Sequence, residues 1–202
     1  IEWLRQSELK PERGFTFDKA MRSILRQDPD VIMIGEIRDP EAAEHAVSLS
    51  LIGRIVGSTI HSNSTIGTIA RLIDMDIERS MIAYALNGVI SQRLARKICA
   101  SCRTPYTPEP TQLAYFGLSA SEIEFVKGKG CDECHNSGYS GRVGIFEVLE
   151  FDTKLRSLIV DKVPMNGLEA YTVEIGMKTL KQDAVEKVLA GITTVEEISK
   201  IV

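Results

Sequence analysis

A β-α-β pattern between residues 30 and 61 limits the possible folds of this chain more than any other feature. It begins with Val31-Ile32-Met33-Ile34, a continuous apolar run rich in β-branched residues. Such a run is typical of a strand covered on both faces, as in a parallel sheet. Asp39 then has the position of an N-cap for a helix that continues to Gly53, and a second strand spans residues 55 to 60. Because right-handed crossovers join parallel strands, the pattern predicts an α/β protein.

Two titratable side chains follow the ends of these strands. Glu36 comes directly after the first apolar run, and His61 follows the second strand. Both should emerge at the carboxyl edge of the sheet, where open α/β sheets bind their ligands. Taken singly, Glu36 is equally explained as a solvated strand end, and His61 as a hydrogen-bonded core or surface residue. Their meeting at one edge favours a functional site.

The rest of the chain is predicted to be largely helical around an irregular middle segment. We expect helices from near Thr16 or Asp18 to Gln27, from Ser64 or Thr65 to Ile73, from roughly Glu78 to Ile98, and from Lys178 to Ala190. Prolines and glycines interrupt residues 99 to 142, which indicates an insertion. Residues 151 to 202 return to helical patterns, and Thr194-Val195-Glu196-Glu197 predicts a capping box at the last helix.

Four cysteines form two C-x-x-C pairs inside the predicted insertion. The pairs are Cys99 with Cys102 and Cys131 with Cys134. Two such pairs supply four thiolates that can close as a tetrahedron on Zn²⁺, and a site closed by four protein ligands is structural rather than catalytic. The alternative is four unrelated buried cysteines. His135 lies next to Cys134 but is not needed as a ligand.

Charge and hydropathy exclude some classes of function. The chain has 24 Lys and Arg against 28 Asp and Glu, a net charge of -4, so it has no general attraction to nucleic acid or anionic membranes. No apolar run approaches the length needed to span a bilayer. Four basic residues lie near the cysteines in the sequence: Arg93, Arg96, Lys97 and Arg103. This cluster of positive charge keeps a zinc-stabilised nucleic-acid-binding module as an alternative. A partner-docking module without catalysis is a further alternative.

Several stretches resemble the type II secretion and type IV pilus assembly ATPases, and together they cover residues 14 to about 200. They are Phe15-Thr16-Phe17 with residues 25 to 39, similar to the Walker B segment; residues 57 to 64 with 71 to 75, similar to the His box; and residues 92 to 99 and 138 to 147, similar to the entry to and exit from the zinc insertion. The four-cysteine insertion resembles the one found in the assembly and secretion motors. The pilus-retraction motors of the same family usually lack such an insertion.

The resemblance implies roles for residues at the strand ends. Glu36 would be the Walker B carboxylate that acts through Mg²⁺, and His61 would sense or position the γ-phosphate of ATP. Arg38 would help to fix the site, and Arg71 would be a supporting cation of the His box. From the residue pattern alone, Arg71 is equally explained as a surface arginine on a helix.

The sequence departs from the family pattern in one large respect. No G-x-x-x-x-G-K-[ST] motif occurs, and the only Gly-Lys dipeptide, Gly128-Lys129, is followed by neither Ser nor Thr. By the resemblance, the P-loop and a second acidic box would lie upstream of Ile1. We therefore expect residues 1 to 202 alone to be inactive as an ATPase, while the intact protein would hydrolyse ATP.

The sequence thus predicts an α/β protein in three segments. Residues 1–98 would be a RecA-like parallel-sheet core fragment, residues 99–142 a zinc-bound tetracysteine insertion, and residues 143–202 a C-terminal helical subdomain. By the resemblance, the intact protein would be a cytoplasmic homohexamer at the inner face of the cytoplasmic membrane. It would use ATP and Mg²⁺ to act on an inner-membrane platform protein, with no nucleic-acid partner expected. The motifs do not separate pilus assembly from secretion or DNA uptake.

Overall fold

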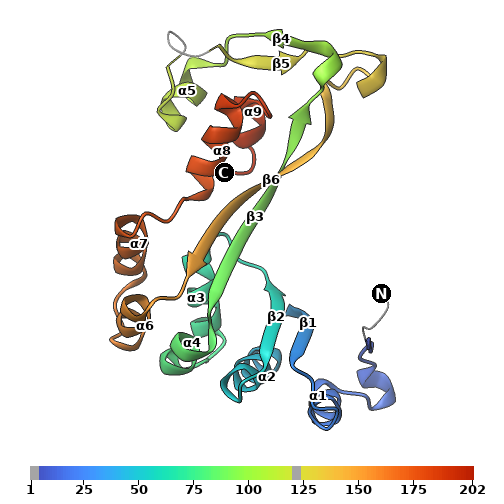
Figure 1. Cartoon of the computed structure of the whole chain (residues 1–202), viewed down its shortest axis with the longest axis vertical. Coiled ribbons are helices and arrows are strands. Elements are labelled where there is room, and N and C mark those ends of the chain that lie inside the picture. Colours follow the sequence, from blue (N-terminus) through green and yellow to red (C-terminus); the bar gives the residue numbers. More distant parts are fainter. Residues whose placement is uncertain (1–4, 120–123) are drawn as a thin grey trace. The chain divides into compact units, whose positions relative to one another are not determined.

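The computed structural model describes residues 5–119 and 124–202 (Figure 1). Residues 1–4 of the expected core segment and 120–123 of the expected insertion lie outside the described residues. The chain divides into two compact units, the first made of Ile1–Gly88 and Glu150–Glu169 and the second of Val89–Leu149 and Ala170–Val202. Each unit combines separate stretches of chain, so this division differs from the three consecutive segments expected from the sequence.

The first unit contains the predicted β-α-β arrangement. Its elements are the 3-10 helix η1 (Pro11–Arg13), α1 (Phe17–Leu25), β1 (Val31–Ile37), α2 (Pro40–Leu51), β2 (Ile55–Ile60), α3 (Thr65–Asp74), α4 (Arg79–Ala85) and α6 (Thr153–Val160). β1 and β2 pair in parallel, with Val31 opposite Ile55 and Ile34 opposite Ser58. The parallel pair joined by α2 confirms the prediction.

Local capping explains where the helices that flank the site begin. The Asp39 carboxylate accepts a hydrogen bond from the Ala42 N–H at 2.9 Å, and the Ser64 hydroxyl accepts one from the Gly67 N–H at 3.0 Å. Each bond satisfies an N–H group that has no partner inside the helix. Both helix starts therefore agree with the sequence prediction.

The β1–β2 pair is covered on one face. Ile32 and Ile34 are buried and pack with residues of α1 and α2. Val31 and Met33, on the opposite face, are 63% and 69% exposed. The expectation that this apolar run is covered on both faces is therefore wrong for the described residues, because α1 and α2 both pack on the face that carries Ile32 and Ile34.

Among the described residues, the second unit contains a long strand pair, a short strand pair, three α-helices and two 3-10 helices. Its elements are β3 (Gly88–Ile98), η2 (Ala100–Cys102), β4 (Arg103–Pro105), α5 (Pro110–Phe116), β5 (Val126–Gly128), η3 (Asp132–Cys134), β6 (Tyr139–Glu150), α8 (Leu180–Leu189) and α9 (Val195–Ile198). β3 pairs with β6, and their arrows point in opposite directions in Figure 1. β4 pairs with β5 in antiparallel fashion. Helix α7 (Met165–Glu174) crosses the boundary between the units.

The helix predicted for residues 78 to 98 is wrong in its second half. Helix α4 ends at Ala85, and β3 begins at Gly88. Ser91 and Ala95 of β3 are buried while Leu94 is exposed, which is the alternation of a strand. Apolar residues four positions apart fit both a helix and a strand, so pairing with β6 decides the outcome. The strand β6 itself was not predicted.

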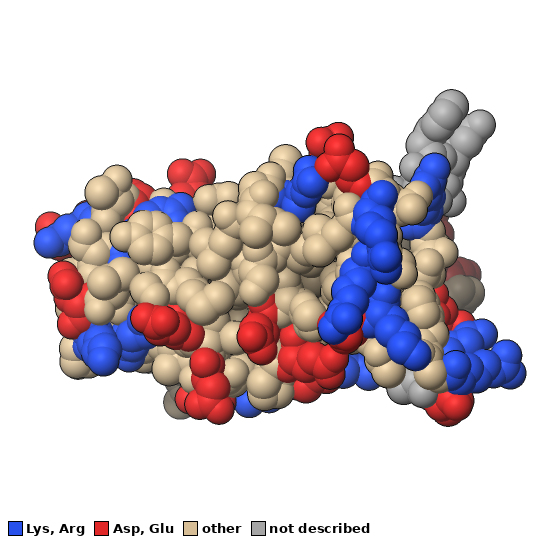
Figure 2. Space-filling view, turned by 90° about the horizontal axis from the view of Figure 1, so that it is seen from below, with Lys and Arg blue, Asp and Glu red and all other residues tan. Residues whose placement is uncertain are grey.

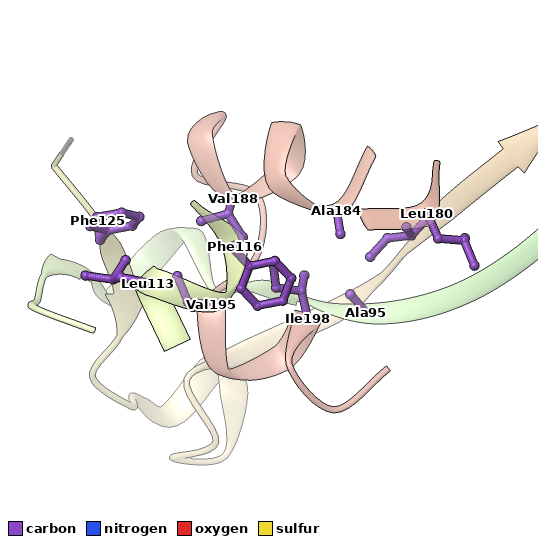
Figure 3. Packing of buried hydrophobic residues seen from close by; sticks show 10 residues of the cluster. Ala95, Leu113, Phe116, Phe125, Leu180, Ala184, Val188, Val195 and Ile198 are labelled. Carbon is purple, nitrogen blue, oxygen red and sulfur yellow. The ribbon is translucent and has the colours of Figure 1, made fainter. Parts of the chain in front are cut away.

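A hydrophobic core holds the second unit together. Figure 3 shows side chains of α5, α8 and α9 meeting there, with Phe116 of α5 and Ile198 of α9 among them. Ile145 of β6 and Ala95 of β3 belong to the same cluster. Burial of a side chain the size of Phe116 stabilises a fold by about 1.5–3 kcal/mol. The expected C-terminal helices thus pack with the strand pair in one core.

Candidate functional site

A bulge in β1 separates Glu36 from the core. The strands pair with Ile34 opposite Ser58 but with Ile37 opposite Ile60, so two residues of β1 face the single residue Thr59 of β2. An extra residue of this kind shifts the alternation of side chains by one position. Ile37 consequently packs against the same core as Ile32 and Ile34. Glu36 is thereby free to point away from the core.

The Glu36 carboxylate contacts His61, the residue directly after β2. His61 Nε2 lies 2.7 Å from Glu36 Oε1, and Arg38 Nε lies 2.5 Å from Glu36 Oε2. The Glu36 side chain is 20% exposed, whereas that of His61 is 95% exposed. Both carboxylate oxygens therefore have basic partners, and one side of the group remains open to solvent.

These residues line a small open pocket. Its volume is about 240 Å³, and its lining includes Glu36, Arg38, His61 and Arg71. The structure thus brings together the four residues singled out from the sequence at this edge of the sheet. One acidic group and three basic groups around an open pocket offer a carboxylate for a metal ion and cations for phosphate oxygens.

The loop that carries His61 is held by hydroxyl groups. Ser62 Oγ lies 2.7 Å from Thr68 Oγ1, and it donates to the Ser64 carbonyl at 3.1 Å. Thr68 lies on α3 and is buried. Sequence reasoning missed this support. The signal was present as a cluster of Ser and Thr directly after His61, which is typical of side chains that fix a loop at a helix start.

The four predicted metal ligands meet in the second unit. The sulfur atoms of Cys99, Cys102, Cys131 and Cys134 all lie within 4.8 Å of one another. Cys99 Sγ is 3.9 Å from Cys131 Sγ, and Cys131 Sγ is 3.7 Å from Cys134 Sγ. A tetrahedron with Zn–S bonds of about 2.3 Å has edges of roughly 3.8 Å. The sulfur positions therefore fit a tetrahedral zinc ion and are too far apart for disulfides.

The backbone around Cys134 favours the thiolate of that residue, whereas burial raises the pKa of Cys102 to about 11. Burial opposes ionisation of Cys134, but N–H groups of Cys131 and Gly138 donate to its sulfur and lower its pKa to about 6. Such N–H···S bonds require a tight turn. Gly130 and Gly138 have φ values of +97° and +75°, which glycine adopts without strain. Both glycines flank the second C-x-x-C pair, Cys131 and Cys134.

Next to the cysteine cluster, the backbone at Gly138 lies against the backbone of β5. A Cβ atom on Gly138 would lie 2.4 Å from the carbonyl oxygen of Gly128 in β5. That distance leaves no room for a side chain, and the φ of +75° adds strain for any other residue. Gly138 is therefore required both by the turn and by the close approach of β5.

Two of the basic residues near the cysteines, Arg96 and Arg103, pack against other parts of the chain. Arg96 binds Glu197 and stacks on Tyr139, its guanidinium carbon lying 4.1 Å from the ring centroid. A Cβ atom on Gly191 would meet the Arg103 guanidinium, so that group packs on the backbone there. The contacts of Arg96 and Arg103 weaken the observation behind the nucleic-acid alternative. Figure 2 shows the face seen from below Figure 1, where Lys and Arg side chains lie beside Asp and Glu.

Sequence comparisons relate the chain to secretion and pilus proteins. The family model described as "Type II/IV secretion system protein" matches residues 1–200. The chain is 42% identical over 202 residues to the Type II secretion system protein E of Pseudomonas aeruginosa, covering 100% of this chain and 40% of that protein. It is also 42% identical over 201 residues to the Type IV pilus assembly ATPase PilB of Thermus thermophilus, covering 98% and 23%. The chain thus spans less than half the length of these curated relatives.

Solved structures give the same relationship at the level of fold. The pilus retraction motor PilT with bound ADP is similar with a TM-score of 0.65 and 28% identity, covering 93% of this chain and 43% of that one. The Legionella pneumophila ATPase DotB has a TM-score of 0.65 at 21% identity, covering 96% and 44%, which shows likeness of fold alone. Within residues 5–119 and 124–202, every helix is too short or too polar to cross a membrane.

Proposed function

Because this chain belongs to the type II/IV secretion system protein family, we propose that it is part of a motor ATPase that powers type IV pilus assembly or type II protein secretion. The observation that carries the proposal is the 2.7 Å contact between Glu36 and His61 at the strand ends. A carboxylate and an imidazole at this edge suit the chemistry of phosphate hydrolysis. Relatives named as pilus assembly ATPases support it.

Glu36 is the acidic group of the proposed site. Bound Mg²⁺ would supply charge neutralisation at the terminal phosphates of ATP, and Glu36 is the side chain here that would hold the ion or its water. Its partners Arg38 and His61 are mostly exposed. Exposed ion pairs contribute only about 0–1 kcal/mol, so a bound nucleotide can replace them at small cost. His61 then becomes available to position the γ-phosphate.

The three basic residues have graded roles in this proposal. His61, whose Nε2 lies 2.7 Å from the Glu36 carboxylate, would contact the γ-phosphate. Arg38, directly after the strand that carries Glu36, would orient the carboxylate. Arg71 lines the same pocket from α3 and would act as a supporting cation. Cations at such positions stabilise the charge that develops on transferring phosphoryl groups.

The four cysteines form the proposed structural zinc site of this motor. Their spacing fits four Zn–S bonds, and Cys99, Cys102 and Cys134 are buried. All four positions are filled by protein ligands, which leaves no coordination site for a substrate. A zinc ion bound there would stabilise the fold of the region around η2 and η3.

The intact protein is proposed to work as a cytoplasmic homohexamer at the inner face of the cytoplasmic membrane. Its first unit is a RecA-like fragment in this proposal, and the similarity to PilT with bound ADP supports the assignment. Its mechanical partner is an inner-membrane platform protein. The motor needs a P-loop that residues 1 to 202 do not contain.

The test is Glu36→Gln in the full-length protein that contains this chain. The amide keeps the size of the side chain but removes the charge that orients the metal and its water. We expect ATP turnover to fall by roughly a hundredfold or more, with little change in equilibrium binding of a non-hydrolysable ATP analogue. Glu41→Gln, at an exposed position on α2, is the matched control and should keep normal turnover. Near-normal turnover in Glu36→Gln would refute this assignment.

A further inference from the structure

We propose that Thr59 is a positioning residue that holds the bulge of β1 in the form that directs Glu36 at His61. The proposal rests on the function proposed above for Glu36. Thr59 is the single residue of β2 that faces the two bulged residues Gly35 and Glu36. Its hydroxyl donates a hydrogen bond to the Gly35 carbonyl at 2.8 Å.

The position of this bond makes it specific to the bulge. Regular pairing of parallel strands uses backbone groups alone, and an extra residue disrupts the ladder locally. Here a side chain of the opposite strand binds the carbonyl directly before Glu36. The peptide that joins Gly35 to Glu36 is therefore held by Thr59 of β2, which lies two residues before His61 in the sequence.

The bond couples the two members of the proposed site. A shift of pairing by one residue would return Glu36 to the face that carries Ile32 and Ile34. Conversely, a bulge that is free to move would vary the 2.7 Å distance between Glu36 and His61. Thr59 opposes both changes because its hydroxyl and the His61 side chain belong to the same three-residue stretch at the end of β2 and directly after it.

A general preference of threonine for strands is the competing explanation, and two substitutions separate it from the proposal. Thr59→Val keeps the β-branched shape and removes the hydroxyl. Thr59→Ser keeps the hydroxyl and removes the branch. Ser58→Ala is the matched control, because the hydroxyl of this neighbouring residue donates to the Thr59 carbonyl, at 3.3 Å, and not to β1 in the described residues.

The experiment measures steady-state ATP turnover and analogue binding on the full-length protein. For Thr59→Val we expect kcat to fall about fivefold, the size that corresponds to losing one neutral hydrogen bond, with the Kd of the analogue changed less than twofold. Thr59→Ser and Ser58→Ala should stay close to wild type. If Thr59→Val fails to assemble, Thr59→Ala takes its place, since it also removes the hydroxyl.

A double-mutant cycle with Glu36→Gln completes the test. If Thr59 acts through Glu36, adding Thr59→Val to Glu36→Gln lowers kcat no further. A fivefold loss in both backgrounds would overturn the proposal, as would normal turnover in Thr59→Val or equal losses in the Val and Ser variants. Normal turnover in Glu36→Gln alone would instead refute the assignment of Glu36, so the two failures are distinguishable.

Discussion

The guanidinium of Arg96 donates hydrogen bonds to both carboxylate oxygens of Glu197, with Nε 2.8 Å from Oε2 and Nη2 2.5 Å from Oε1. The backbone N–H of Arg96 also donates to Glu197 Oε2 at 3.3 Å. This two-point bond ties β3 to α9 across 101 residues of chain. The Glu197 side chain is 9% exposed, so its charge needs these partners.

We predict that Glu197→Gln destabilises the chain at neutral pH and loses this effect in acid. Hydrogen bonding to Arg96 lowers the pKa of Glu197 to about 2, against the opposing effect of burial. A lowered pKa stabilises the fold above the normal Glu value near 4.5, and the gain disappears as the pH falls toward 2. We expect a loss of about 1–3 kcal/mol at pH 7, reduced by the partial exposure of Arg96.

Urea unfolding of wild type and Glu197→Gln at pH 7 and between pH 5 and 2 measures the effect. The stability difference should shrink over the acid range, because only wild type loses the charged pair there. Glu174→Gln, at an exposed position on α7, is the control and should shift the midpoint little. A difference that stays constant down to pH 2 would rule out the ion pair as its cause.

The cysteine cluster predicts about one zinc ion per chain in protein purified without chelator. Elemental analysis measures the ratio directly. Cys131→Ser removes one thiolate, so we expect faster amide hydrogen exchange in residues 99 to 142 while β1, α2 and β2 keep their protection. An absence of zinc in the wild-type protein, or a disulfide within a C-x-x-C pair, would contradict the metal site.

We predict no ATP turnover above background for residues 1 to 202 alone, because P-loop N–H groups and the P-loop lysine supply most of a phosphate cradle. A coupled assay with Mg²⁺ tests this, and the Glu36→Gln form of the same chain is the matched blank. Sustained Mg²⁺-dependent hydrolysis that Glu36→Gln abolishes would show that these residues suffice for catalysis. Weak nucleotide binding is compatible with the prediction.

Gly138→Ala should destabilise the cysteine region by more than an ordinary surface substitution. The new Cβ would lie 2.4 Å from the Gly128 carbonyl oxygen at a φ of +75°, so β5 or the knuckle must move. We expect a loss of about 1–3 kcal/mol and weaker retention of zinc during chelator challenge. Gly141→Ala shares a positive φ of +74° but meets no atom within 4 Å, which makes it the control for strain alone.

The sequence predicted the elements that local signals define. The run Val31 to Ile34, the Asp39 cap and the Gly53 stop lie within about twenty residues, and each acts on its immediate neighbours. The meeting of Glu36 and His61 followed from a general rule for parallel strands. The bulge at Gly35 did not follow, because it depends on which residue of β2 lies opposite.

Contacts between residues far apart in the sequence explain the predictions that were wrong. β3 and β6 are separated by forty residues of chain, and nothing within Leu86 to Ile98 reveals the partner that turns this stretch into a strand. The expected capping box at α9 formed in part. Thr194 accepts from the Glu197 N–H at 3.3 Å, but the Glu197 carboxylate binds Arg96 instead. Tertiary contacts thus replaced a local one.

The division into two units has a mechanical consequence. The chain passes between them at residues 88–89, 149–150 and 169–170, so three peptide connections join them. A protein with a single linker comes apart after one proteolytic cut, whereas here a nick at any one crossing leaves two covalent tethers. Neither unit can be excised as one continuous segment of the gene.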